Sequence, residues 1–479
     1  MSIRYEMVVG LEVHAQLATK SKLFCSCPTD GFGAPPNSRV CPLCTGQPGT
    51  LPVLNRKAVE LAFRAALALD CRLAPFSIFA RKNYFYPDLP KGYQISQYEH
   101  PFAQNGRLQV KDKSVRIHRI HLEEDAGKLL HAIGSKELDG TLVDFNRGGM
   151  PLIEIVSEPD MRSSEEAAAY LSALKEIVQY VGASRCDMEK GEMRCDANVS
   201  IRSSGSAELG VRVEIKNLNS VRAVKEALDH EFERQSELLT CGGRVLQETR
   251  LWDHEAGTTR AMRSKEEAHD YRYFPDPDLT PLVADEAFIE KIRSELPELP
   301  AARRQRFLSE YGLSEYDAGL LTSQQALADY FEAAVRGRQA AAKTAANLMA
   351  TELLARLNAE DVGIDASKVK ASDLGELAGL VQDGTLSSKG AKAAFAALWA
   401  GGDSPAVLVQ KLGLAQVSDE GPLRAWVQEA LSTNAQAAAD AKAGKQRAVG
   451  ALVGAVMKLS CGQANPAMVN RLIKESLGL

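Results

Sequence analysis

Residues 7–14 read Met-Val-Val-Gly-Leu-Glu-Val-His, and their alternation of apolar and polar side chains decides the fold class. Successive side chains of a strand point to opposite faces. Every second residue from Met7 to Val13 therefore shares one face, while Glu12 and His14 share the other. Such a strand packs one face on a core and leaves the other to water or to a functional site, as is typical of antiparallel sheets. A parallel sheet covered on both faces would show continuous apolar runs instead.

The same pattern returns later in the chain, and helices separate the strands. Apolar and polar residues alternate again over residues 195–202 and 211–216. We therefore predict an α+β fold, with an N-terminal, mostly antiparallel sheet, flanking helices and two all-helical domains after it. The expected flanking helices are one capped by Ser163 or Ser164, one capped by Ser220, and one over residues 55–70.

The length of 479 residues is too great for one hydrophobic core and suggests about three domains. Prolines cluster between residues 275 and 300, and the sequence beyond about residue 301 is rich in Ala and Leu with helical periodicity. Gly401, Gly402 and Pro405 mark a second break. The predicted domains are an α+β domain over residues 1–294, a helical domain over residues 295–406 and a small helical tail module over residues 407–479.

Composition is that of an ordinary globular protein. Apolar residues make up 45% of the chain and charged residues 25%. No apolar run approaches the ~18–20 residues needed to cross a bilayer. The first residues lack the basic start, apolar stretch and cleavage site of a signal peptide. We therefore expect a cytoplasmic protein with no membrane partner.

The net charge of −5 excludes a general polyanion binder, so any nucleic acid must be bound through a local basic patch. Residues 441–479 form one candidate, because they hold six Lys and Arg against a single glutamate, a net charge of +5. Two interpretations of this segment stay open from charge alone: a soluble helical tail with basic faces, and a module that contacts nucleic acid.

Four of the nine cysteines lie within twenty residues of one another. Cys25-Ser-Cys27 and Cys41-Pro-Leu-Cys44 form two close pairs separated by thirteen residues, a spacing that can place four thiolates around Zn²⁺. Such a closed site is structural, and it would hold together a loop near residues 25–44 that is too rich in Gly and Pro to order itself by packing. The alternative is four unrelated buried cysteines.

Acidic residues stand within or beside several of the predicted strands. Glu12 and His14 project to the same side of one strand and can reach a common point. Glu154 is enclosed in the run Leu-Ile-Glu-Ile-Val, where a carboxylate is costly unless it is paired or coordinates a cation. Carboxylates are the ligands that Mg²⁺ prefers, and this ion commonly bridges to nucleotide phosphates. The candidate magnesium ligands are Glu12, His14, Glu124, Glu154 and Asp196.

Residues 121–128, His-Leu-Glu-Glu-Asp-Ala-Gly-Lys, place three acids in a row at the end of a predicted strand. Like charges repel, so such a run is normally held apart in water or compensated by cations. A strand sends Glu123 and Glu124 to opposite faces, so at most one or two of the three acids share a site. Two interpretations stay open: a solvated strand end, and one wall of a cation site with Glu124 turned inward.

The chain has neither the phosphate loop of P-loop enzymes nor a dinucleotide-binding glycine motif. If ATP is used, metal and basic side chains on a sheet must hold its phosphates, and Lys82, Lys128 and Arg147 are the candidates. Residues 81–88 interleave basic and aromatic residues, a pattern that suits stacking on an adenosine end. A tyrosine-rich core strand explains the same segment equally well.

Several long strings follow one another in one order along the whole chain. They are GLEVHAQL from Gly10, RKNYFYPDLPKGYQISQY from Arg81, HLEEDAGK from His121, DFNRGGMPLIEIVSEPD from Asp144, MRCDANVSIR from Met193, EIKNLNS from Glu214 and DYRYFPDPDL from Asp270. Together they resemble the B subunits of the heterotrimeric aspartyl/glutamyl-tRNA(Asn/Gln) amidotransferases. Through KQRAVGALVGAVM from Lys445 and GQANP from Gly462, the C-terminal module resembles the small helical tail of that family. The resemblance implies that residues 1–294 are a catalytic, cradle-like domain and that the tail contacts tRNA.

The resemblance implies an ATP- and Mg²⁺-dependent ligase that phosphorylates the side-chain carboxylate of Glu-tRNA(Gln), Asp-tRNA(Asn) or both, and then amidates it. Ammonia comes from glutamine hydrolysed on the A subunit, and a short C subunit wraps around the other two; the cognate aminoacyl-tRNA synthetase is an optional further partner. The family's metal ligands fall on the five candidates named above, its important lysine falls on Lys82, and its zinc-bearing branch carries the four cysteines. We accordingly take Glu124, Lys82 and His14 as candidate catalytic residues.

Two other functions remain as alternatives. A ligase that joins a small carboxylate to an amine would use the same phosphorylation but would need no basic tail. A non-catalytic RNA-binding adaptor would use the zinc loop and the tail for recognition and would not depend on Glu124 or Glu154. No glutaminase signature is visible in the chain, so an amidotransferase role requires a partner that delivers ammonia.

Overall fold

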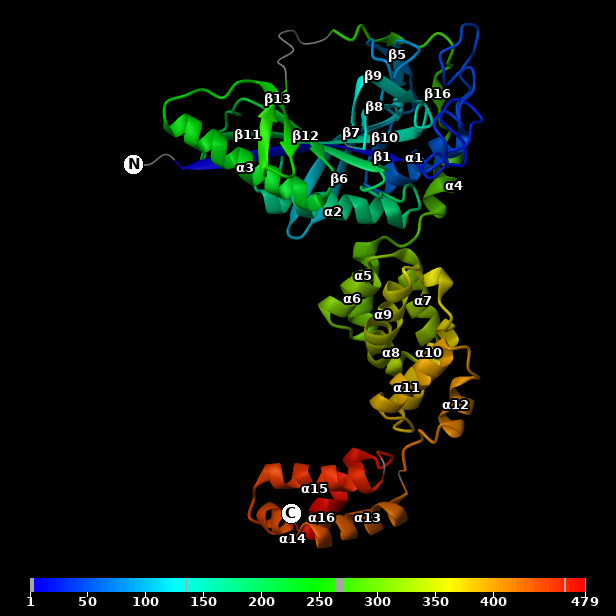
Figure 1. Ribbon diagram of the computed structural model, residues 1–479, viewed down its shortest axis with the longest axis vertical. Coiled ribbons are helices and arrows are strands. Elements are labelled where there is room, and N and C mark those ends of the chain that lie inside the picture. Colours follow the sequence, from blue (N-terminus) through cyan, green and yellow to red (C-terminus); the bar gives the residue numbers. More distant parts are fainter. Residues whose placement is uncertain (1–3, 135, 263–269, 418, 461, 479) are drawn as a thin grey trace. The chain divides into compact units, whose positions relative to one another are not determined.

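The computed structural model describes residues 4–134, 136–262, 270–417, 419–460 and 462–478. It divides into two compact units, Met1–Leu299 and Pro300–Leu479 (Figure 1). Among the described residues, no helix is long and apolar enough to cross a membrane.

A nine-stranded sheet organises the first unit, in the order β14-β13-β12-β11-β1-β10-β7-β6-β2. Neighbouring strands run antiparallel except for β12 and β13, which run parallel. The predicted fold class is confirmed, because the mostly antiparallel sheet is followed by a helical region. The nine strands are β1 (Tyr5–Gln16), β2 (Arg72–Leu73), β6 (Ala103–Val110), β7 (Lys113–Glu124), β10 (Pro151–Ser157), β11 (Met193–Ser203), β12 (Val213–Leu218), β13 (Glu248–Asp253) and β14 (Thr258–Ala261).

The two faces of the sheet differ as the alternation in residues 7–14 predicts. Val9, Leu11 and Val13 are buried in the core of the first unit, whereas Glu12 and His14 belong to the opposite, polar face. Helices α1 (Arg56–Ala68), α2 (Ser164–Tyr180) and α3 (Val221–Thr240) contribute buried residues to the same core, and Figure 1 shows α2 and α3 along one side of the sheet.

The helix caps fix where these three helices begin. Ser163 accepts a hydrogen bond from the backbone N–H of Glu166, and Ser220 accepts one from Ala223, so two predicted caps are confirmed. Asn55 caps α1 in the same way, by accepting hydrogen bonds from the backbone N–H groups of the first turn.

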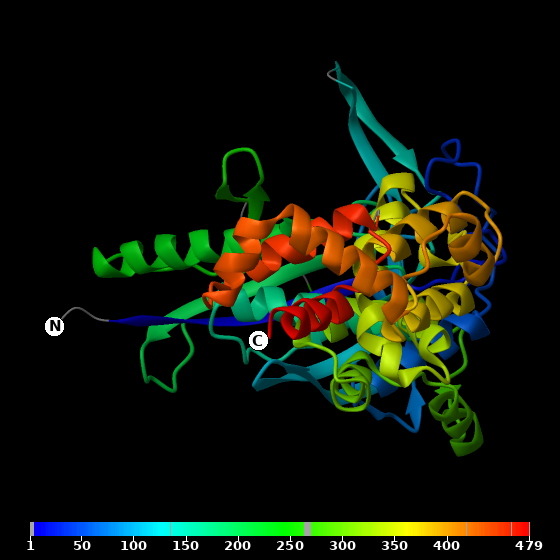
Figure 2. The ribbon, with the colours of Figure 1, turned by 90° about the horizontal axis from the view of Figure 1, so that it is seen from below.

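Three small sheets surround the polar side of the first unit. They are β15-β4-β5, β16-β3 and the hairpin β8-β9, which stands away from the main sheet in Figure 2. A short helix, α4, packs on α1 near the end of the unit. The bounds are β3 (Phe76–Ser77), β4 (Ala80–Asn83), β5 (Tyr93–Ser96), β8 (Lys128–Ile133), β9 (Lys136–Asp144), β15 (Phe274–Pro275), β16 (Leu282–Val283) and α4 (Glu286–Ser294).

The second unit is helical and holds two separate buried clusters. One cluster is built from α5 to α12, between Phe307 and Val409, and the other from α13 to α16, between Leu423 and Ile473. Finer boundaries at 294/295 and 406/407 stay predictions. The helices are α5 (Pro300–Tyr311), α6 (Glu315–Leu321), α7 (Gln325–Val335), α8 (Ala342–Leu348), α9 (Leu354–Glu360), α10 (Ala371–Gln382), α11 (Ser388–Trp399), α12 (Pro405–Lys411), α13 (Glu420–Thr433), α14 (Ala435–Lys442), α15 (Gln446–Leu459) and α16 (Pro466–Leu477), with short helical turns η1 (Gln339–Ala341), η2 (Met349–Leu353) and η3 (Ile364–Ala366).

Candidate functional site

Strand register brings acids and histidines together on the polar face of the sheet. His14 of β1 lies opposite Glu154 of β10, and Glu154 in turn lies opposite His121 of β7. Glu12 shares the face of His14, and Glu123 shares the face of His121, because each pair is two residues apart on one strand. Three strands that are far apart in the sequence therefore present five ligand-type side chains to one place.

These five residues form what we call the acid–histidine cluster: Glu12, His14, His121, Glu123 and Glu154. The Nε2 atom of His14 lies 3.3 Å from Glu154 Oε2 and 3.5 Å from Glu123 Oε1. The Nε2 atom of His121 lies 3.1 Å from Glu154 Oε2 and 3.6 Å from Glu123 Oε2. Glu154 and Glu123 thus each lie beside both imidazoles, and Glu154 is the nearer of the two.

Charge within the acid–histidine cluster shifts the pKa of its members in opposite directions. Burial disfavours the charged imidazole, but contact with Glu154 and Glu123 outweighs burial and raises the pKa of both His14 and His121 to about 9. Burial also disfavours a charged Glu154, yet the two histidines lower its pKa well below the usual range. Burial, followed by the charges of Glu154 and Asp196, raises the pKa of Glu12 above its usual range.

The donor set fits a divalent cation. Two groups of possible ligand atoms, each within 4.8 Å of one another, share Glu154: Glu12 with His14, and His121 with Glu123. Carboxylate oxygens suit Mg²⁺, and a cation would relieve the unfavourable charge at Glu12. Of the magnesium ligands expected from the sequence, the structure brings together Glu12, His14 and Glu154.

The other two expected ligands lie differently. Asp196 faces Glu12 across the β1–β11 pairing, and its Oδ2 is 2.7 Å from the Nζ of Lys216. Glu124 follows Glu123 on β7 and so leaves the strand on the opposite face. Its Oε1 contacts Lys91 Nζ and accepts a 2.9 Å hydrogen bond from the backbone N–H of Ile95. A metal-ligand role for Glu124 stays a prediction.

His121 and Glu123 were not among the residues expected from the sequence. The signal that finds them is the same alternation that pairs Glu12 with His14, because His121 and Glu123 are also two residues apart on one strand. This alternation identifies the two residues as part of the cluster only when the strand register is known, because the register places His121 opposite Glu154.

The three consecutive acids are not a solvated charge run, since Glu123, Glu124 and Asp125 are each at most 4% exposed. Each has its own cationic or hydrogen-bonding partners on a different side. Asp125 Oδ1 lies 2.9 Å from Arg194 Nη2, and its Oδ2 lies 3.6 Å from Arg147 Nε. The run therefore splits into three separate contacts.

The three candidate phosphate-binding cations have different surroundings. The Nζ of Lys82 lies 4.8 Å from the ring centre of Tyr271 and 5.8 Å from that of Tyr84, and within the described parts of the chain it forms no ion pair. Lys128 is exposed at the start of β8. Arg147 donates hydrogen bonds to the carbonyl oxygens of residues 126 and 127, at 3.1 Å and 2.6 Å, so part of its donor capacity is already used.

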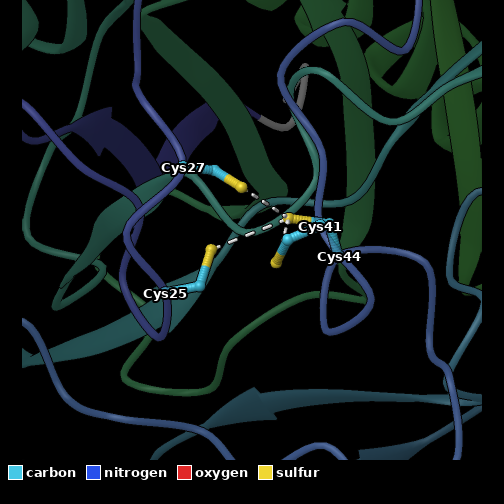
Figure 3. Close-up of side chains that lie close together, drawn as sticks. All are labelled: Cys25, Cys27, Cys41 and Cys44. Carbon is cyan, nitrogen blue, oxygen red and sulfur yellow. Dashed lines mark hydrogen bonds between the residues drawn. The ribbon is translucent and has the colours of Figure 1, made fainter.

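The four cysteines of the predicted zinc loop converge, as Figure 3 shows. The Sγ atom of Cys44 lies 3.7 Å from those of Cys25 and Cys41 and 3.8 Å from that of Cys27. Four sulfurs at Zn–S bonds of about 2.3 Å in a tetrahedron would be about 3.8 Å apart. The alternative of four unrelated cysteines is therefore wrong, and these residues fit a tetrahedral metal ion; we call them the cysteine cluster.

The thiol of Cys44 has a lowered pKa. A hydrogen bond from the Cys25 thiol, followed by the charge of Lys22, lowers the pKa of Cys44 to about 4. Burial raises the pKa of Cys27 to about 11. Metal binding would require all four thiols to be deprotonated.

Comparison with known proteins agrees with this architecture. Residues 7–290 match the GatB/GatE catalytic domain, and residues 329–477 match the GatB domain. Relatives named as the B subunit of aspartyl/glutamyl-tRNA(Asn/Gln) amidotransferase align along almost their whole length. The chain is 51% identical to the relative from Carboxydothermus hydrogenoformans (99% of each chain), 52% to that from Brevibacillus brevis (99% of each) and 52% to that from Geobacter sulfurreducens (99% of this chain, 100% of the relative).

The catalytic-domain match covers all strands of the main sheet and both residue clusters. Identity of about half over nearly the full length extends this agreement to the helical unit. The chain therefore belongs to the family of the aspartyl/glutamyl-tRNA(Asn/Gln) amidotransferase B subunits.

Proposed function

We propose that this chain uses ATP to activate the side-chain carboxylate of Glu or Asp esterified to tRNA and then amidates it. The products are Gln-tRNA(Gln), Asn-tRNA(Asn) or both. The observation that carries the proposal is the acid–histidine cluster, because it concentrates cation ligands on the polar face of the sheet in a chain without a phosphate loop. The printed name of the relatives supports the substrate class.

The chemistry needs two displacements. First, a carboxylate oxygen of the amino acid attacks the γ-phosphorus of ATP, the bond to the β-phosphate oxygen breaks, and an acyl phosphate and ADP form. Second, ammonia attacks the acyl carbon, inorganic phosphate leaves with the electron pair of the C–O bond, and the nitrogen gives up a proton. Phosphorylation is required because a carboxylate oxygen is a poor leaving group.

The residues of the chain mainly align charged groups in this proposal. Glu12, His14 and Glu154 would hold Mg²⁺, with Glu123 and His121 beside them, and the ion would neutralise charge on the phosphates. Lys82 is the first candidate cation for a phosphoryl group, because its Nζ rests on tyrosine rings and forms no ion pair with any carboxylate among the described residues. Lys128 and Arg147 are weaker candidates for the same role, and Glu124 keeps the catalytic role predicted for it.

The remaining parts supply structure and partners. We propose that the cysteine cluster holds a structural Zn²⁺, that residues 1–294 carry catalysis and that the tail, residues 407–479, contacts tRNA. A glutaminase A subunit and a small C subunit would complete the enzyme and deliver ammonia, and the cognate synthetase would hand over the charged tRNA. Because the substrate is a charged tRNA, we place the reaction in the cytoplasm.

The test uses the assembled complex with free ammonium in place of glutamine. Glu-tRNA(Gln) and Asp-tRNA(Asn) are prepared with ¹⁸O in the side-chain carboxylate and incubated with ATP. We expect ATP cleavage that depends on the charged tRNA, amide formation, and one ¹⁸O atom in the released phosphate. ATP cleavage with no ¹⁸O in phosphate would exclude the acyl phosphate, and turnover of free glutamate would favour a small-molecule ligase.

A further inference from the structure

A buried lysine adjoins the cysteine cluster. Lys22 is 0% exposed, and its Nζ lies 3.4 Å from Cys44 Sγ and 3.1 Å from the carbonyl oxygen of Phe145. Throughout the described residues, no carboxylate lies within ion-pair distance of it. A buried ammonium group is costly unless an opposite charge compensates it.

The cysteine cluster supplies that charge when it holds a metal. Four thiolates around one divalent cation carry a net charge of −2, and the Lys22 ammonium is in direct contact with one of the four sulfurs. A hydrogen bond to a ligand atom from outside the coordination sphere stabilises the ligand in its charged form and fixes its orientation. Lys22 and the metal-bound thiolates therefore compensate one another.

The other end of the Lys22 contact is the loop of residues 145–149. Three further hydrogen bonds join this loop to the cysteine loop, and in one of them the backbone N–H of Arg39 donates to Asn146 Oδ1 at 2.9 Å. The backbone N–H of Phe145 donates a 2.8 Å hydrogen bond to Asn37, and Asn146 donates one of 2.8 Å to the carbonyl of Pro35. The loop and the cysteine cluster are thus one hydrogen-bonded structure, with Lys22 as its only charged link among the described residues.

Two contacts join the loop of residues 145–149 to Asp125, the last of the three acids at the end of β7. Gly149 donates a 2.8 Å backbone hydrogen bond to Asp125, and Arg147 lies 3.6 Å from the Asp125 carboxylate. Gly149 also accepts a 2.9 Å hydrogen bond from the backbone N–H of Leu23, next to Lys22. A displacement of the cysteine cluster would therefore shift Asp125 through a few covalent bonds and hydrogen bonds.

We propose that Lys22 is a positioning residue that joins the metal-bound cysteine cluster to the loop of residues 145–149 and so sets the placement of Arg147 and Asp125. The inference rests on the metal-binding part of the proposed function. If it were only a space-filling core residue, its charge would be irrelevant and an apolar side chain of similar length would replace it.

The experiment compares two lysines of one loop in full-length protein. Lys22→Met keeps the length of the side chain and removes the charge, whereas Lys20→Met makes the same change at an exposed position two residues earlier. Two readouts concern the metal: the sulfur-to-metal charge-transfer spectrum with Co²⁺ in place of Zn²⁺, and the rate of Zn²⁺ loss to a chelator. A third readout is amide hydrogen exchange over residues 143–150, with α2 as the internal reference.

For Lys22→Met we expect a shifted Co²⁺ spectrum, a loss of Zn²⁺ affinity by about 10–100-fold, and faster exchange over residues 143–150 with α2 unchanged. Lys20→Met should match the wild type. Lys22→Arg, which restores the charge, should recover the Co²⁺ spectrum at least in part; if it fails to fold, the Lys22→Met spectrum decides alone.

Lys22→Met with a wild-type Co²⁺ spectrum and Zn²⁺ retention would overturn the proposal, and so would a wild-type protein that binds neither metal. Faster exchange everywhere, α2 included, would also overturn it, because that result indicates general destabilisation. None of these outcomes bears on the ¹⁸O experiment, so a failure of this inference is distinguishable from a failure of the amidation reaction.

Discussion

The cysteine cluster and the acid–histidine cluster are both groups of metal-ligand side chains, but their charges are compensated in different ways. In the acid–histidine cluster, His14 and His121 lie among three carboxylates, so the two imidazoles compensate most of the negative charge. In the cysteine cluster, four thiols converge and Lys22 is the one cation in contact among the described residues. The first cluster can therefore persist without a metal, whereas the second needs one to hold its loop together.

This contrast predicts that the acid–histidine cluster matters for chemistry and not for folding. Glu154→Gln removes the carboxylate nearest to both imidazoles and should lower ATP-dependent amidation by about 10²–10³-fold, the cost of losing one well-placed electrostatic contact. The melting temperature should change little, because Glu123 still lies beside both imidazoles and the hydrophobic core stays intact. Glu158→Gln is the matched control, since Glu158 lies just beyond the same strand and contacts His118 instead. Activity near that of the wild type in Glu154→Gln would remove the cluster from the mechanism.

The same contrast shows what the sequence reveals and what it conceals. The cysteine pairs lie close together in the chain, so their spacing alone predicts the cluster that Figure 3 shows. Helix caps such as Ser220 are equally local and were predicted for the same reason. His121 and Glu123 join their cluster only through the pairing of β7, β10 and β1. No single segment of the sequence determines this register. Sequence reasoning could choose between Glu123 and Glu124 only once the direction of the strand face was known.

Lys22 illustrates a second limit. A lysine beside a predicted metal loop is expected to be exposed, and nothing in its neighbours indicates that its ammonium group is buried. One partner of its ammonium group is Cys44, 22 residues along the chain. The other is the carbonyl oxygen of Phe145, 123 residues along the chain. Only the closure of the loop of residues 145–149 over the cysteine loop makes it a buried charge.

The opposite expectation applies to the cysteine cluster, where metal loss should damage structure first. Cys44→Ser removes the sulfur that contacts the other three, and Zn²⁺ should fall from about one per chain to less than about a tenth of that. Amidation should fall by about tenfold through the loop of residues 145–149, and limited proteolysis should cut residues 17–55. Cys241→Ser is the control, because Cys241 is exposed and remote in sequence. Full Zn²⁺ content in Cys44→Ser would show that the cluster is not the metal site.

The basic tail provides a third region, in which charge should affect binding alone. Lys442, Arg447, Lys458 and Lys474 are exposed and form no ion pair within the part of the chain that the structure describes, whereas Lys445 pairs with Asp440. Replacing the four free cations by Ala should raise the KM for charged tRNA by about tenfold and lower its salt dependence, with kcat unchanged. Turnover in ammonium assays at saturating tRNA measures this separation. An unchanged KM would favour the interpretation of the tail as a soluble helical module.

The smallest effect on amidation is expected at Glu231, a buried carboxylate whose negative charge is balanced by two arginines, Arg234 and Arg250. It is 0% exposed, and Arg234 donates two hydrogen bonds to it, at 2.9 Å and 2.8 Å, while Arg250 Nε lies 3.1 Å away. These contacts join α3 to β13. Glu231→Gln should therefore lower the free energy of unfolding by about 2 kcal/mol, the scale of hydrogen bonds to charged groups, and leave amidation at 25 °C unchanged.

The pH dependence of this loss has a definite sign. Burial disfavours the charged form of Glu231, but Arg234, Gln235 and Thr259 outweigh burial and lower its pKa below 4.5. A lowered pKa means that the stabilisation is present above about pH 4.5 and disappears as the pH falls through the folded-state value. Denaturant unfolding of the wild type and of Glu231→Gln should thus differ at pH 7 and converge in acid. A difference that persists in acid would show that the carboxylate acts through packing and not through charge, and a loss of amidation would mean that compensated acids also serve the chemistry.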